Sequence, residues 1–162
     1  MHEGREETEL ERDDRNLTEL MGELRVALPG VQVLFAFLLV VPFNQRFGQT
    51  TRFERDLYFA ALLCTLLAAI LLIAPTVIHR LEFRRGQKAH VVSVANRLTI
   101  VGLAVFAVAM TCAIALVTVY LFGGATAIVT TAVAALAFLA FWFVGPLLRR
   151  RSWERSGRVP EA

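Results

Sequence analysis

The four longest apolar runs of this 162-residue chain contain no Asp, Glu, Lys, Arg or His. They are residues 26–43, 57–78, 98–122 and 125–148. Ion-coupled transporters normally hold an ionisable side chain inside the membrane, because a group there must bind and release the ion. The absence of such a side chain counts against ion transport through these segments.

Cysteine, histidine and catalytic motifs are also scarce. Cys64 and Cys112 both lie inside apolar runs, where thiols behave as small apolar groups, so we expect no disulfide. The sequence also has no disulfide or zinc-binding spacing of cysteines. The three His residues do not form a ligand set, and we expect no metal site and no cofactor. No phosphate loop, dinucleotide fingerprint, nucleophile elbow or metalloprotease helix occurs, so we expect no enzyme. The charged first 25 residues do not resemble a cleavable signal peptide.

The sequence does contain apolar runs long enough to cross a membrane as helices. A hydrocarbon core of about 30 Å needs about 20 apolar residues in a helix, and all four runs approach or exceed that length. The prediction is an all-α integral membrane four-helix bundle with spans at about 26–47, 57–78, 98–122 and 125–148. The spans lie in one domain, residues 16–150, between tails predicted to be disordered at 1–15 and 151–162.

Small side chains recur every four residues in the second and third runs. One series is Ala61, Thr65 and Ala69, its neighbour is Ala60, Cys64 and Ala68, and the third run has Ala107, Thr111 and Ala115. Such faces let helix backbones approach closely in lipid. The sequence after Gly86 predicts one helix of about 34 residues running into the third span. Gly123-Gly124 predicts a tight turn, which makes spans three and four antiparallel neighbours.

The segment before the first run has the pattern of an amphipathic cytosolic helix. Asn16 and Glu19 have capping-box spacing, and five apolar residues share one face: Leu17, Leu20, Met21, Leu24 and Leu28. Proline removes a backbone donor, so Pro29-Gly30 predicts a kink or break. We expect this helix to lie on the membrane and bend into the bilayer; alternatively, it continues through the kink.

Orientation follows from the distribution of basic residues. Fourteen of the 17 Lys and Arg residues lie in the N-terminal, second-connection and C-terminal zones, which places both termini in the cytoplasm of a bacterial plasma (inner) membrane. We expect anionic headgroups to bind near six of these residues: Arg84, Arg85, Lys88, Arg149, Arg150 and Arg151. Basic clusters that flank spans are poor evidence for nucleic-acid binding, which we do not expect.

Six polar residues are the candidates for function. Gln32 is the only amide well inside a run, and its donors and acceptor predict a contact with another helix, either structural or along a substrate path. At the cytosolic boundary the candidates are Glu19, Glu23, Arg25, Arg80 and Arg97. Either glutamate could pair with Arg80 or Arg97 across helices, as an anchor.

Two blocks of this sequence resemble a known group of proteins. They are the ELRV block at residues 23–26 with GVQVLFAFLL at 30–39, and the AP, HR and FRR pairs and triplet near 74–85. They resemble an uncharacterised family of small four-span bacterial membrane proteins, mostly actinobacterial and often labelled sodium:proton antiporters. The resemblance covers about residues 15–150 and differs at Leu28-Pro29, where a polar residue is expected. It implies the fold and the membrane location.

Two functions follow as hypotheses. The first is a small multi-pass membrane protein without catalysis, acting as a membrane component, homo-oligomer or partner subunit. The second is a sodium/proton antiporter-like secondary transporter, with Gln32, Thr111, Tyr120, Glu19 and Glu23 as its polar groups.

Overall fold

Helices account for all regular structure in the part of the chain that the computed structural model describes, residues 8–82, 88–145 and 147–148. The elements are α1 (Glu9–Val40), η1 (Val41–Phe43), η2 (Gln45–Gln49), α2 (Arg52–Glu82), α3 (Lys88–Phe122), α4 (Gly124–Phe138) and η3 (Leu139–Val144). Four segments are long and apolar enough to cross a membrane: Asp14–Phe43, Arg52–Leu81, Val91–Phe122 and Gly124–Val144. The predicted all-α class and the four apolar helices are confirmed.

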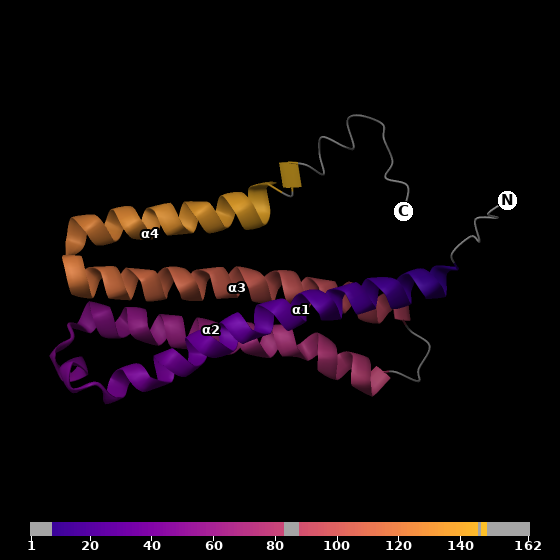
Figure 1. Cartoon of the computed structure of the whole chain (residues 1–162), viewed down its shortest axis with the longest axis horizontal. Coiled ribbons are helices and arrows are strands. Elements are labelled where there is room, and N and C mark those ends of the chain that lie inside the picture. Colours follow the sequence, from indigo (N-terminus) through magenta and orange to yellow (C-terminus); the bar gives the residue numbers. More distant parts are fainter. Residues whose placement is uncertain (1–7, 83–87, 146, 149–162) are drawn as a thin grey trace.

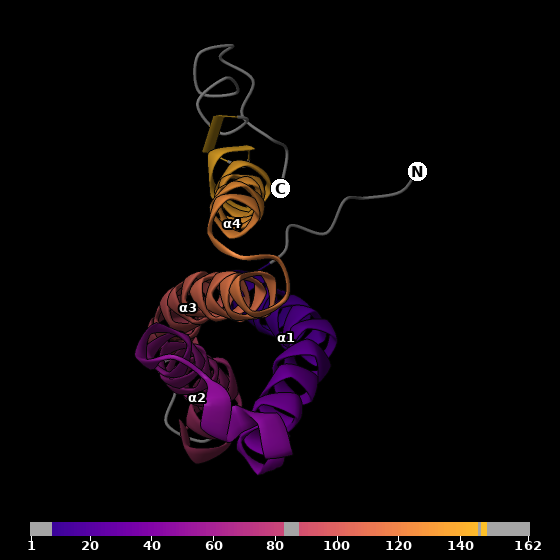
Figure 2. The same cartoon turned by 90° about the vertical axis from the view of Figure 1, so that its left-hand side faces the viewer.

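The helices run side by side, and only three of them pack together. Figures 1 and 2 show α1, α2 and α3 grouped, with α4 outside them along α3. Among the described residues, α4 packs against α3 and its own extension η3, and not against α1 or α2. The predicted four-helix bundle is therefore a three-helix unit with one peripheral helix. The physical reason is that the turn at Gly123 holds α4 beside α3, whose other side is already covered by α2.

The two ends of the molecule differ in the connections that they hold. The turn end holds η1, η2 and the α3–α4 turn, at the left of Figure 1. At the opposite end, called the open end, α1 begins at Glu9, α2 ends at Glu82 and α3 begins at Lys88.

Helix α1 begins earlier than the sequence suggested. Thr8 caps it: its hydroxyl accepts the Glu11 N–H, and the Glu11 carboxylate accepts the Thr8 N–H at 2.9 Å. The Thr8 N–H and the Thr8 hydroxyl both donate to the Glu11 carboxylate, and these two bonds hold the pKa of Glu11 below its usual value because they favour the charged form. Asn16 is not the cap, and helix extends over residues 9–15, a stretch predicted to be disordered. The helix also continues through Pro29, so the alternative of a continuous helix holds and a break does not.

The apolar face of α1 packs on protein. Leu17, Leu24, Val31 and Leu38 recur every seven residues and are all buried. A seven-residue repeat keeps one seam of a helix facing its neighbours over several turns. Leu24 and Val31 join a core formed with Ala68 and Leu72 of α2 and with Phe106 and Ala109 of α3. The face predicted to lie on the membrane surface is thus the seam that fastens α1 to α2 and α3.

The small-residue face of α2 meets α3, as the spacing predicted. Ala61, Thr65, Ala68 and Leu72 are completely buried. The two helices lie close together at Gly102 of α3, where a Cβ atom would lie 2.8 Å from both Cγ and Cδ2 of Leu72. Helix α3 begins at Lys88 and has 35 residues, which confirms the predicted long helix.

A buried tyrosine ties α1 to α2 near the turn end. The Tyr58 hydroxyl donates to the Leu38 carbonyl at 3.0 Å, and its ring meets Phe47 edge-on at a centroid distance of 5.2 Å. In an α-helix the Leu38 carbonyl would accept the N–H of residue 42, but that residue is proline and has none. Tyr58 therefore supplies the hydrogen bond that Pro42 cannot.

The turn between α3 and α4 depends on a glycine. Gly123 has φ of 79°, a left-handed conformation that side chains with a Cβ rarely adopt. This confirms the predicted tight turn and the antiparallel α3–α4 pair.

In η3, which is a π-helical turn, the Gly145 N–H donates to the Ala140 carbonyl, and Trp142 packs edge-on against Phe138.

Candidate functional site

A polar cleft lies between α1 and α3 near the open end. It has a volume of about 300 Å³ and brings together Asn16, Glu19 and Glu23 of α1 with Ser93 and Asn96 of α3. Leu20 and Val92 also line it. Glu19 and Glu23 lie four residues apart on one face of α1, so their two carboxylates face the same cleft. Two of the predicted residues, Glu19 and Glu23, thus line one cleft.

The predicted ion pairs do not form. The side chains of Glu19, Glu23, Arg80 and Arg97 make no ion pair or hydrogen bond with any described residue, and Arg80 and Arg97 are exposed. The reason is helical geometry. Ser93 and Asn96 are three residues apart, share one face of α3 and line the cleft, whereas Arg97 is about 100° further round the helix.

Gln32 points away from the rest of the chain. It follows Val31, whose side chain is completely buried on the seam, so its own side chain lies on the outer face of α1 and is exposed. Its side-chain amide forms no hydrogen bond with a described residue. The helix that Gln32 is predicted to face is therefore not among the described helices of the same chain. The seven-residue repeat of Leu17, Leu24 and Val31 is the sequence signal that places Gln32 outside.

Four threonine hydroxyls inside the helices are bonded locally. The hydroxyls of Thr65, Thr99, Thr111 and Thr118 each donate to the carbonyl four residues earlier in the same helix, at 2.7–2.9 Å. Such back-bonding satisfies a threonine inside an apolar helix without a partner helix. Thr111 therefore does not offer its proton to a path between helices. Cys64 and Cys112 are free and partly buried.

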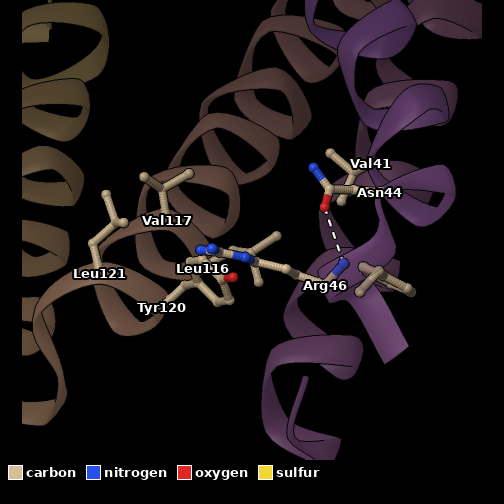
Figure 3. Close-up of a pocket in the computed structure, with 8 residues that line it drawn as sticks. Val41, Asn44, Arg46, Leu116, Val117, Tyr120 and Leu121 are labelled. Atoms are coloured by element: carbon tan, nitrogen blue, oxygen red, sulfur yellow. Dashed lines mark hydrogen bonds between the residues drawn. The ribbon is translucent and has the colours of Figure 1, made fainter. Parts of the chain in front are cut away.

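A second hollow lies at the turn end, and the sequence did not suggest it. This groove of about 480 Å³ separates the η1–η2 connection from the last turns of α3. Its apolar walls are Val41, Phe47, Leu116, Val117 and Leu121, and its polar members are Asn44, Arg46 and Tyr120. Figure 3 shows the Arg46 side chain extending from the connection toward Leu116 and Tyr120 on α3. A cavity of this size and apolar character is in the range of small-molecule sites.

Hydrogen-bond donors in the groove are unused. The Asn44 side-chain oxygen accepts the Arg46 backbone N–H at 3.0 Å, which leaves the Asn44 amide group as a donor. The Arg46 guanidinium and the Tyr120 hydroxyl have no partner among the described residues. Within the described turn end, Glu54 is occupied: its carboxylate accepts the Thr51 N–H at 2.6 Å, and the Thr51 hydroxyl accepts the Glu54 N–H and caps α2.

Some expectations lie outside the described residues or have no test here. Arg84, Arg85, Arg149, Arg150 and Arg151, expected to meet anionic headgroups, are outside the described ranges. Lys88 is the first residue of α3. Arg25 is exposed on the outer face of α1, one seven-residue repeat before Gln32. In the searched part of the chain, no three His, Cys, Asp or Glu side chains cluster as metal ligands.

Comparison with known proteins gives one match. Residues 6–146 match the model of a family of unknown function, DUF6328. Neither a curated protein nor a solved structure matches the chain.

Proposed function

Because the chain belongs to this family of unknown function, we propose a role from its own geometry: a non-catalytic, multi-pass membrane protein that works as an assembly of identical chains. The observation that carries the proposal is the exposed Gln32 within the apolar span Asp14–Phe43. The four long apolar helices support membrane insertion, and the outward amide supports assembly.

Depth in the bilayer makes the exposed amide significant. Gln32 lies six residues after Val26, where the charge-free run begins, so it sits about 9 Å inside that run at about 1.5 Å per residue. Lipid tails offer no hydrogen-bond partner, and an unsatisfied polar group in hydrocarbon costs several kcal/mol. A neighbouring polypeptide on this face relieves that cost.

A second copy of the chain is the partner that the face fits. A primary amide both donates and accepts, so Gln32 of two copies related by a twofold axis can bond each other. Both copies enter the membrane with the same orientation, which brings identical residues to the same depth. Pro29 and Ala36 lie one turn to either side of Gln32, are exposed and have small side chains, so two α1 helices can approach closely.

We expect Gln32→Leu to weaken this assembly. An interhelical hydrogen bond in a membrane contributes about 0.6–2 kcal/mol, so two bonds across the axis predict a roughly tenfold or larger rise in the dissociation constant. The measurement is energy transfer between donor- and acceptor-labelled chains in liposomes as the lipid-to-protein ratio rises. The matched control is Gln49→Leu, which removes an exposed amide from η2, outside the span. Transfer that is absent in the native protein, or equal in both variants, contradicts the proposal.

An antiporter-like transporter is the second candidate, and the cleft with Glu19 and Glu23 is the observation that favours it. Against it, the four charge-free runs hold no ionisable Asp, Glu, Lys, Arg or His, and the Thr111 hydroxyl is bonded within α3. We therefore expect no sodium flux driven by a proton gradient in proteoliposomes. Flux that is lost in Glu23→Gln and kept in the exposed control Asp56→Asn would establish the transporter instead.

The proposed location is a bacterial plasma membrane with the open end in the cytoplasm. The support is the excess of Lys and Arg in the zones that flank this end, against Arg46, Arg52 and Arg55 at the turn end. A cysteine placed at Gly48 should react with an impermeant reagent in intact cells, and protection of that cysteine would reverse the orientation.

A further inference from the structure

We propose that the turn-end groove is a binding site for one anionic phospholipid, with its phosphate at Arg46 and an acyl chain along α3. The proposal rests on the membrane location proposed above and is independent of assembly through Gln32. It starts from one feature of the turn end: a hollow with apolar walls and unused donors at one rim.

The position of the groove matches the depth of lipid headgroups. Arg46 lies three residues beyond Phe43, where the first apolar span ends, and Tyr120 lies two residues before Phe122, where the third span ends. Arginine and tyrosine at span ends meet the interfacial layer of a bilayer. The groove therefore spans the boundary between headgroups and acyl chains.

Donor chemistry identifies the headgroup. The Arg46 guanidinium, the Tyr120 hydroxyl and the Asn44 amide are donors without partners among the described residues, and all three line the groove. Phosphate oxygens are acceptors only, and guanidinium–phosphate bonds are charge-assisted and often bidentate. No carboxylate lines the groove, so nothing there binds the ammonium group of a zwitterionic lipid. A net anionic phospholipid fits best.

The apolar wall identifies the rest of the ligand. Leu116, Val117 and Leu121 form one side of the groove on α3, and Val117 and Leu121 are exposed by 54% and 60%. An acyl chain that lies along these residues replaces the exchanging lipid chains that would otherwise cover them. The bound lipid then has a fixed position on α3. Inorganic phosphate would use the donors at the rim and leave this wall empty.

The test compares lipid retention by native mass spectrometry. Protein purified from membranes is exchanged into detergent with equal phosphatidylglycerol and phosphatidylcholine, and the bound fraction of each lipid is measured. We expect one phosphatidylglycerol per chain, and an occupancy lowered about tenfold by Arg46→Gln, as loss of a charge-assisted contact predicts. Val117→Trp, which fills the groove without touching the charge, should lower it similarly.

Three further readings separate the site from general attraction. Arg52→Gln removes a positive charge from the same end but outside the groove, and we expect no more than a twofold change. Equal losses in Arg46→Gln and Arg52→Gln overturn the proposal, as does equal retention of phosphatidylcholine. Displacement of the lipid by millimolar inorganic phosphate, with full retention in Val117→Trp, also overturns it. Failure of the chain to enter membranes at all would refute the proposed function rather than the site.

Discussion

Gly102→Ala should destabilise the folded chain by about 1–3 kcal/mol, although alanine is the better helix former. The added methyl group would lie 2.8 Å from Cγ and Cδ2 of Leu72 and 3.2 Å from Cβ of Leu71. Leu72 cannot simply turn aside, because its side chain is completely buried against the core that contains Leu24 and Val31. Helices α2 and α3 must therefore separate, and their packing is the most extensive in the molecule. Unfolding monitored by helical signal in mixed micelles measures the change.

The same substitution at Gly22 is the matched control. A Cβ atom there meets nothing within 4 Å, so Gly22→Ala should stabilise α1 by up to about 1 kcal/mol through helix propensity. A third variant isolates the contact: in a Leu72→Ala background, Gly102→Ala should lose most of its cost. If both glycine substitutions stabilise the protein, the close approach of α2 and α3 at Gly102 is not a feature of the native state.

Tyr58→Phe should cost about 1–3 kcal/mol, the usual cost of leaving a buried acceptor unsatisfied. The variant keeps the ring and its edge-on contact with Phe47 and loses only the hydroxyl that donates to the Leu38 carbonyl. Water cannot replace that donor, because Leu38 and Tyr58 are both buried and Leu38 lies within an apolar span. The free energy of unfolding in micelles again reports the effect.

If Tyr58 compensates for the missing N–H of Pro42, the two substitutions should be coupled. Pro42→Ala restores a backbone N–H close to the Leu38 carbonyl, so Tyr58→Phe should be less costly in that background than in the native chain. An unchanged cost would mean that the Leu38 carbonyl is not the group that needs Tyr58. The Tyr58 bond could have been anticipated from the sequence in part, since proline after four apolar residues predicts an orphaned carbonyl, but not which residue satisfies it.

The candidate sites differ in how far the sequence predicted them. Glu19 and Glu23 could be selected as boundary acids because helical spacing alone places them on one face, and both line the cleft between α1 and α3. The sequence also predicted Arg97 as a partner for these acids, but Asn96 faces α1 instead. A shift of one residue turns a side chain about 100° around α3, and sequence spacing does not fix which residue faces the neighbouring helix. The groove at Arg46 was missed because it joins residues about 70 positions apart, and no local pattern links η2 to the end of α3.

By itself, the sequence determined the number of apolar helices, the long α3, the turn at Gly123 and the small-residue face of α2. These features follow from local chemistry: run length, glycine conformation and the spacing of alanine and threonine. Only the tertiary structure decided that Gln32 faces outward, that α4 packs on α3 and not on the described α1 or α2, and that Arg46 reaches an apolar groove. The physical reason is that membrane-spanning helices are apolar on all sides. Composition therefore predicts that a helix crosses the membrane, but not which of its faces packs against another helix.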